Sequence, residues 1–260
     1  MTNSFEQHGI NHLSASSCTA FVTSRAMWCL ERLLKWDSPK TAPMHAGTAG
    51  EDGIVHGLKN LDAAPTECVD QAMKRFRDLM VLTKDERREK YEKVLPYFVQ
   101  HGLQELRPYG TPSHVQGKIE KQMDGVAVPF VGYFDLYWAD AGVLTDIKTT
   151  LKMPSAIKVN HARQVALYKS TISDNLDARV TYVTGNGAKT YALENHREHV
   201  EALHKIALTM QRFLGLSKDK HELCALVCPD YEHFVWSSDA ARAAGTHSAA
   251  TRRAGSACRP

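Results

Sequence analysis

The 260-residue chain lacks the marks of several large protein classes. Its longest apolar-leaning run, 126–134, is far shorter than the about 20 residues that a membrane-spanning helix needs, so we expect no membrane partner. Residues 1–10 show no basic segment followed by an apolar core, which predicts no secretory signal and a cytoplasmic protein with reduced thiols. Six cysteines are too few for a disulfide scaffold, and 43% apolar residues exclude a disordered or collagen-like chain.

Net charge is also scarce. The formal charge of +3 comes entirely from residues 237–260, which carry four arginines against one aspartate, while the rest of the chain is neutral. Bulk charge therefore does not mark a nucleic-acid-binding protein. Neither a glycine-rich phosphate loop nor a nucleophile elbow is present, which argues against a small-molecule enzyme on an unrelated α/β fold.

The pattern of elements predicts an α/β (α+β mixed) fold, in which helices flank a central mixed β-sheet. Helical patterns cover about 14–34, 47–58, 66–106, 156–172 and 196–214, and strand patterns cover 115–120, 126–150, 180–185 and 189–193. Ser14, Ser16 and Ser17 are alternative caps of the first helix. We expect one domain over residues 1–236, followed by a disordered basic tail over 237–260.

Two carboxylates and a lysine stand out in the strand-rich segment. If residues 128–138 and 143–149 are antiparallel strands joined by the turn at Asp140-Ala141, then Asp135 directly faces Asp146. Lys148 lies two residues beyond Asp146 and projects from the same face. Either a shared proton or a divalent cation such as Mg²⁺ would relieve the repulsion of such an acid pair. The alternative is an ordinary hairpin with a surface acid pair.

The helix expected over 156–172 adds a polar stripe. His161, Gln164 and Tyr168 are spaced so that they share one helical face and could contact a phosphate or a base. Segment 146–170 also carries five basic residues against one acidic residue; these are Lys148, Lys152, Lys158, Arg163 and Lys169. A local basic stripe beside an acid pair favours binding of a polyanion.

These motifs resemble a known family. Gly132-x-x-Asp135, Asp146-x-Lys148 and Gln164-x-x-x-Tyr168, in this order, resemble the RecB-like branch of the PD-(D/E)XK nuclease superfamily. Leu13-Ser14-Ala15-Ser16 opening one helix and Gly47-Thr48-x-x-Glu51 opening the next resemble the first motif of that branch, in the form found in phage-type exonucleases. The resemblance covers roughly residues 13–170.

The resemblance implies a restriction-endonuclease-like core and DNA cleavage that depends on Mg²⁺ or Mn²⁺. Asp135, Asp146, Glu51 and the Ile147 carbonyl would bind the metal, and Lys148 would assist the attacking water. The expected DNA-binding residues are His161, Gln164, Tyr168, Lys152, Lys158 and Arg163, where Gln164 and Tyr168 position either DNA or the lysine. Glu120, on the preceding strand, is a further residue for the same site.

Two further features occur in some members of this family. Some members carry His in the first motif, which makes His56 a competitor of Glu51; five helical residues place the two about 140° apart, so we take Glu51. Some members hold an iron–sulfur cluster, for which the candidates here are Cys18 or Cys29 with Cys224, Cys228 and Cys258. The spacing of Cys224 and Cys228 has one residue too many, so we expect buried thiols, Cys68 among them, and no cluster.

The leading hypothesis is therefore a DNA exonuclease, ahead of an endonuclease, acting in DNA recombination, repair or phage DNA processing in a bacterial or phage-infected cell. By analogy, its partners are DNA, further copies of the chain in a homo-oligomer, and a single-strand-binding or annealing protein. The alternative is a catalytically inactive nucleic-acid-binding accessory protein on the same fold.

Overall fold

The computed structural model describes residues 3–238 and 241–244. The chain groups into two compact units. The first contains Met1–Pro39, Glu120–Val131 and Val200–Pro260, and the second contains Lys40–Ile119 and Gly132–His199. The sequence predicted one domain over 1–236, whereas the contacts between residues group the chain into two units. The chain leaves the first unit after Pro39 and re-enters it at Glu120.

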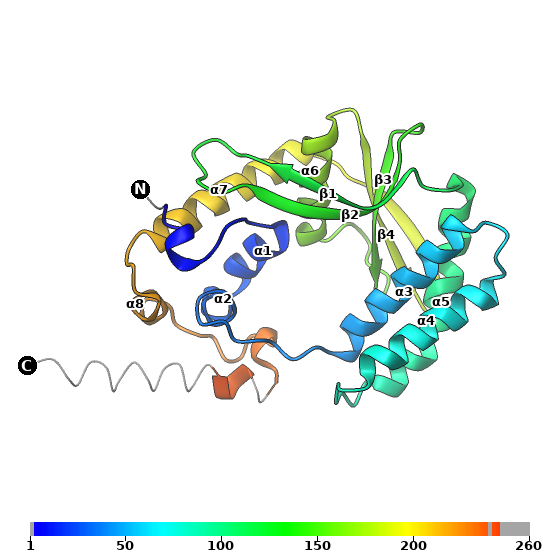
Figure 1. Ribbon diagram of the computed structural model, residues 1–260, viewed down its shortest axis with the longest axis horizontal. Helices are drawn as coiled ribbons and strands as arrows, with labels where there is room; N and C mark the ends of the chain where they lie inside the picture. Colours follow the sequence, from blue (N-terminus) through cyan, green and yellow to red (C-terminus); the bar gives the residue numbers. More distant parts are fainter. Residues whose placement is uncertain (1–2, 239–240, 245–260) are drawn as a thin grey trace, which may run out of the picture. The chain divides into compact units, whose positions relative to one another are not determined.

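The helices and strands follow one another in a mixed order (Figure 1). The α-helices are α1 (Ala15–Thr23), α2 (Arg25–Arg32), α3 (Ala42–Lys59), α4 (Pro65–Met80), α5 (Arg88–Leu106), α6 (Val159–Ile172), α7 (His196–Leu214) and α8 (Lys220–Ala225). The strands are β1 (His114–Lys121), β2 (Phe130–Trp138), β3 (Val143–Thr149), β4 (Asp177–Thr184) and β5 (Gly187–Ala192). Short 3₁₀ turns cover Glu6–His8, Arg107–Tyr109 and Phe234–Trp236.

The five strands form one mixed sheet in the order β1-β2-β3-β4-β5. β2 and β3 are antiparallel and pair Leu136 with Thr145, which is the register that the sequence predicted. β3 and β4 are parallel, because α6 connects them as a crossover helix, and β4 and β5 are antiparallel again. The predicted mixed α/β fold, a mixed sheet flanked by helices, is confirmed.

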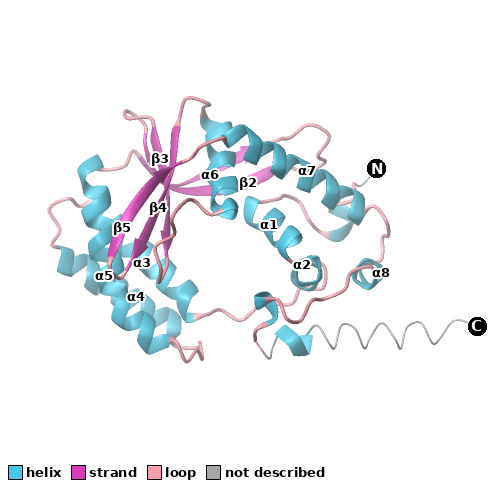
Figure 2. Ribbon diagram, turned by 180° about the vertical axis from the view of Figure 1, so that it is seen from behind, coloured by secondary structure: helices cyan, strands magenta, loops and turns pink. Residues whose placement is uncertain are grey.

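The second unit has helices on both faces of its strands. α3, α4 and α5 lie on one side of β3–β5, and α6 lies on the other side (Figure 2). The larger core joins apolar side chains of α3–α5 to those of the sheet, including Leu136, Val143, Ile147 and Val183. This packing holds α3 against β3 and so positions Glu51 of α3 relative to Asp146 and Lys148 of β3.

Several helix boundaries differ from the predicted ones for local reasons. α3 begins at Ala42 and not near Gly47, because Pro43 lies in the first turn, where its missing N–H is not needed. The segment 66–106 divides into α4 and α5. Ser24 ends α1 and caps α2 by accepting from Met27 N, so the stretch to Leu34 forms two helices. Of the three candidate caps, Ser14 is the one that accepts, from Ser17 N.

The first unit packs α1, α2, α8 and the C-terminal part of α7 around aromatic side chains. The rings of Phe21 and Trp28 meet edge to face at 5.2 Å, and Phe21 also contacts Phe213. Of the predicted tail, Ala241 is buried and Arg242 Nε donates to Trp236 O; residues 239–240 and 245–260 lie outside the described residues. Within 3–238 and 241–244, no helix is both long and apolar enough to cross a bilayer.

Candidate active site

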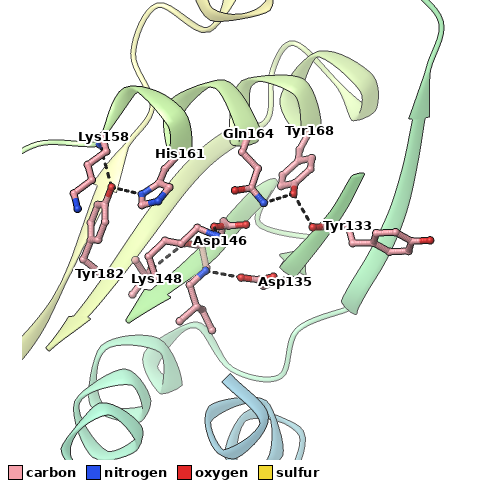
Figure 3. Close-up of polar contacts among 12 residues, drawn as sticks. Tyr133, Asp135, Asp146, Lys148, Lys158, His161, Gln164, Tyr168 and Tyr182 are labelled. Atoms are coloured by element: carbon pink, nitrogen blue, oxygen red, sulfur yellow. Dashed lines mark hydrogen bonds and ion pairs between the residues drawn. The ribbon is translucent and has the colours of Figure 1, made fainter. Parts of the chain in front are cut away.

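Asp135, Asp146 and Lys148 come together where β2 and β3 run side by side (Figure 3). The paired register ends at Leu136 and Thr145, so Asp135 and Asp146 occupy the next positions. At this point Asp135 Oδ2 accepts a hydrogen bond of 2.7 Å from the Ile147 backbone N–H. Lys148 Nζ lies 2.6 Å from Asp146 Oδ2, as expected for side chains two residues apart on one face.

Asp146 is the most enclosed acid of this group. It is 0% exposed, and burial raises its pKa above the ordinary value although the ion pair with Lys148 lowers it. Within the described part of the chain, neither carboxylate oxygen has a partner in hydrogen-bond geometry, and Oδ2 has the ion pair as its contact. A buried carboxylate with an unpartnered oxygen is costly, which suits it to a cation.

Asp135 and Glu51 add two more carboxylates to the same electrostatic environment. Burial, and then the charges of Asp146 and Glu51, hold the pKa of Asp135 well above its ordinary value. Burial also raises the pKa of Glu51, although a 3.0 Å hydrogen bond from Gln116 Nε2 lowers it in part. Each group therefore resists carrying a negative charge beside the others.

Helix α3, which carries Glu51, packs against the end of β3. A Cβ at Gly47 would lie 3.4 Å from Thr149 Oγ1, and a Cβ at Gly50 would lie 3.5 Å from Thr149 Cγ2. Both distances are ordinary van der Waals separations, so α3 lies in direct contact with the end of β3. Glu51 follows Gly50 directly, so its carboxylate is held near Asp146 and Lys148 and interacts with both charges.

Lys148 is held in its charged form. Burial disfavours its charge, but Asp146, Asp135 and Glu51 together outweigh burial and raise its pKa above the ordinary value. The ammonium is therefore a hydrogen-bond donor at neutral pH. The assistance of Lys148 to an attacking water stays a prediction, and a charged lysine could give it by donating a hydrogen bond.

The Gln164–Tyr168 pair of α6 forms a bridge to β2. Gln164 Nε2 donates to Tyr168 Oη at 2.7 Å, and that hydroxyl donates to the Tyr133 backbone carbonyl at 2.7 Å (Figure 3). Tyr168 is 2% exposed, and its ring lies where a Cβ at Gly132 would meet it at 2.7 Å. Tyr168 therefore links α6 to the Tyr133 carbonyl of β2, and its predicted role toward DNA or Lys148 stays a prediction.

His161, one turn before Gln164, contacts a residue that the sequence did not single out. Its Nδ1 lies 2.7 Å from the hydroxyl of Tyr182 on β4, which also accepts the Lys158 backbone N–H at 3.0 Å. Burial, and then the charges of Lys148 and Lys158, lower the pKa of His161 to about 4. Because Tyr182 is the parallel-strand partner of Lys148, the two lie side by side in the sheet.

The remaining predicted residues lie in different places. His56 Nε2 lies 3.1 Å from Glu67 Oε1 of α4, which is consistent with the choice of Glu51 over His56. Lys152 and Lys158 are exposed, and Arg163 is half-buried with a buried Nε. Glu120 is exposed on β1 and belongs to the first unit, and its part in the site stays a prediction.

The oxygen atoms around Asp146 can be compared with the ligands that Mg²⁺ needs. Among residues 3–238 and 241–244, no three His, Cys, Asp or Glu side chains form a ready-made metal group. Mg²⁺ does not need one, since it is held by one or two carboxylates and keeps several waters. The unpartnered, fully buried Oδ1 of Asp146 and the remaining oxygen of Asp135 fit that kind of site.

The cysteines considered for a cluster are spread over the first unit. Cys18, Cys29 and Cys224 are buried, and Cys228 is exposed. Cys258 lies outside the described residues. Cys68 is buried in the second unit, where burial raises the pKa of its thiol.

The raised pKa values predict how stability depends on pH in chelator. Because the folded pKa values of Asp135, Asp146 and Glu51 exceed the ordinary values of about 4, the folded protein holds protons that the unfolded chain releases. The free energy of unfolding should therefore fall as pH rises from about 4 through those values. Asp135→Asn should match the wild type near pH 4 and exceed its unfolding free energy by at least about 1 kcal/mol at pH 8.

Chemical denaturation at both pH values measures this difference. Asp140→Asn, in the exposed turn between β2 and β3, is the matched control and should give the wild-type pH dependence. A difference between Asp135→Asn and the wild type that does not change with pH would contradict charge repulsion at the site.

Sequence reasoning missed two residues of the site, Gln116 and Tyr182. Gln116 has φ of 52°, an unusual left-handed value for a strand residue, and nothing in the sequence marks it as a partner of Glu51. Tyr182 could be found only once β4 was placed parallel to β3, in the register that sets it beside Lys148.

Comparison with known proteins identifies no relative. No family model matches the chain, and no curated protein matches it. A solved structure described as "Crystal structure of SSO0001" is similar over 72% of this chain and 84% of its own, with 13% sequence identity and a TM-score of 0.35. Similarity at this TM-score supports no statement about fold or function.

Proposed function

We propose that this chain is a metal-dependent deoxyribonuclease of the RecB-like type, an exonuclease in preference to an endonuclease. The observation that carries the proposal is the fully buried carboxylate of Asp146, with an unpartnered oxygen, beside Asp135 and Lys148. Acids so placed destabilise the folded protein when ionised, and enzymes accept this cost where charge is needed for chemistry.

The reaction would be attack of water on phosphorus, with a new P–O bond formed and the bond to one sugar oxygen broken. Lys148, charged and 26% exposed, would donate from Nζ to a phosphate oxygen and offset the negative charge that grows there. The hydrogen bond from the Ile147 N–H to Asp135 Oδ2 holds this carboxylate in one orientation. The other oxygen, Asp135 Oδ1, then has a fixed position. Gln164 and Tyr168 would tie β2 to α6 through the Tyr133 carbonyl and so keep Asp135, two residues further along β2, in place.

Asp146, Asp135 and Glu51, with the Ile147 carbonyl, would hold Mg²⁺ or Mn²⁺. When bound, the ion supplies Lewis-acid polarisation of the phosphate and activation of the water nucleophile. The exposed ammonium groups of Lys152 and Lys158 would attract the DNA backbone at low salt.

Incubation of the full chain with end-labelled linear DNA and with closed circular DNA tests the proposal. We expect degradation of linear DNA with Mg²⁺ or Mn²⁺, no degradation in excess chelator, and survival of the circle. Cleavage of the circle would make the enzyme an endonuclease. Undiminished activity in chelator would contradict metal dependence, and inactivity with both metals would contradict the nuclease itself.

One observation favours the alternative, an inactive nucleic-acid-binding accessory protein. The 2.6 Å ion pair between Lys148 and Asp146 neutralises both groups within the protein, as a purely structural pair would. DNA binding that persists unchanged in Asp135→Asn, together with absence of nicking in Mn²⁺, would decide for this alternative.

A further inference from the structure

The Tyr182 hydroxyl lies in a closed set of hydrogen bonds next to the candidate active site. It accepts the N–H of Lys158, the residue that precedes α6, at 3.0 Å, and it lies 2.7 Å from His161 Nδ1. Tyr182 is 0% exposed, so its hydroxyl proton needs an acceptor inside the protein. His161 Nδ1 is the acceptor that the described part of the chain offers.

This requirement fixes the protonation of His161. If Tyr182 donates its O–H to Nδ1, the Lys158 N–H, the Tyr182 hydroxyl and Nδ1 are all satisfied, and the imidazole proton must sit on Nε2. If Nδ1 carried a proton, the Tyr182 oxygen would accept two hydrogen bonds and its own proton would be buried without an acceptor. Both the other tautomer and the imidazolium are therefore disfavoured.

The Nε2–H group that remains belongs to a ring close enough to Lys148 for the lysine charge to act on it. Lys148 and Tyr182 are Cα partners on parallel strands, and their side chains project from the same side of the sheet. Figure 3 shows the His161 ring next to the Tyr182 hydroxyl, on the side of α6 that faces Lys148 and Asp146. Within residues 3–238 and 241–244, Nε2 has no hydrogen-bond partner, so this donor is available to a ligand.

Resting on the proposed function, we propose that His161 is a neutral phosphate-contacting residue, whose Nε2–H donates to an oxygen of the phosphodiester beside Lys148, and that Tyr182 is the positioning residue that fixes this tautomer. A neutral donor suits this place because Lys148 already supplies a positive charge. Tyr182 acts through His161 and does not itself touch the substrate, since it is fully buried.

Nitrogen NMR of the imidazole rings tests the positioning role without any cleavage. The His161 signals, assigned by their loss in His161→Gln, should show the Nε2–H tautomer at pH 7 in the wild type. Tyr182→Phe keeps the buried ring but removes the hydroxyl, and should give a mixture of tautomers. Tyr191→Phe is the matched control, because the Tyr191 ring contacts Tyr182 while its hydroxyl donates to Pro154 O. The Nδ1–H tautomer in the wild type would overturn the inference.

Cleavage of linear DNA in Mg²⁺ tests the contact itself. His161→Leu should lower kcat/KM roughly 10- to 100-fold, whereas His161→Gln, which keeps an N–H donor near the Nε2 position, should stay within a few-fold of the wild type. Tyr182→Phe should cost about tenfold, and should cost nothing further in the His161→Leu background, since it acts through that residue. Tyr191→Phe should cleave as the wild type does.

The outcomes separate this inference from the proposed function. If the wild type cleaves DNA and both His161→Leu and Tyr182→Phe cleave equally well, the inference is overturned and the nuclease assignment stands. If the wild type cleaves nothing, the nuclease assignment falls, and fluorescence anisotropy with the same oligonucleotide decides on His161. Unchanged affinity in His161→Leu then overturns the contact, and weaker binding with normal binding by His161→Gln supports it.

Discussion

Asp146→Asn is expected to reduce cleavage of linear DNA by roughly 10³-fold or more at saturating Mg²⁺, since it removes the acid best placed to hold the ion. The amide has nearly the shape of the carboxylate, so the strand should keep its packing. The substitution leaves Lys148 without its 2.6 Å ion pair, but Lys148 is less buried than Asp146, so the unfolding free energy in chelator should fall by less than it does in Lys148→Met. Single-turnover assays and chemical denaturation measure the two quantities.

Asp177→Asn is the matched control for this substitution. Asp177 begins β4 in the same unit. Its side chain is 42% exposed and forms an ion pair with Arg179. Its amide variant should cleave DNA at the wild-type rate. Wild-type cleavage by Asp146→Asn would remove the basis of the nuclease proposal, whereas global unfolding of that variant would show that the carboxylate is needed for the fold.

Lys148→Met is expected to reduce cleavage by roughly 10²- to 10³-fold, the usual effect of removing one charged donor from a site where negative charge develops. It should also destabilise the protein, because Asp146 loses the cation 2.6 Å away and remains fully buried. Breaking a buried pair on one side costs up to roughly 3–5 kcal/mol, and protonation of Asp146 will reduce that figure. Thermal unfolding at pH 8 and pH 5 should show a smaller loss at the lower pH.

The double variant Asp146→Asn with Lys148→Met separates the two effects. It should recover part of the stability lost in Lys148→Met, because the fully buried charge of Asp146 is removed as well, but should recover no activity. Lys189→Met is the matched control: Lys189 is exposed on β5, opposite Tyr182 in the sheet, and should tolerate the change. Loss of stability in the double variant equal to that in Lys148→Met would contradict the role of the buried charge.

The parts of the site that the sequence predicted correctly are local. A short turn joins β2 and β3, and side chains alternate along a strand, so the register and the shared face of Asp146 and Lys148 follow from spacing alone. The helical spacing of Gln164 and Tyr168 likewise gave their mutual contact. Such relations need only the geometry of one element or one hairpin.

The spacing of residues along the sequence did not reveal which side chains of the site are buried. Tyr168 lies on the same face of α6 as His161. It is nevertheless 2% exposed and donates to Tyr133 O, because β2 passes beneath it. For the same reason the raised pKa of Lys148 could not be anticipated, since it depends on how three carboxylates of different elements surround it. The division of residues 1–236 into two units also depends on long-range contacts.

By itself, the sequence determined the hairpin that holds Asp135, Asp146 and Lys148, because these residues lie within one turn and two strands. Only the tertiary structure decided which distant groups join them. Glu51 reaches the site because α3 packs against β3, and Tyr182 reaches it because the α6 crossover sets β4 parallel to β3. Both contacts join residues far apart in the chain, and only the packing of the helices on the sheet selects them.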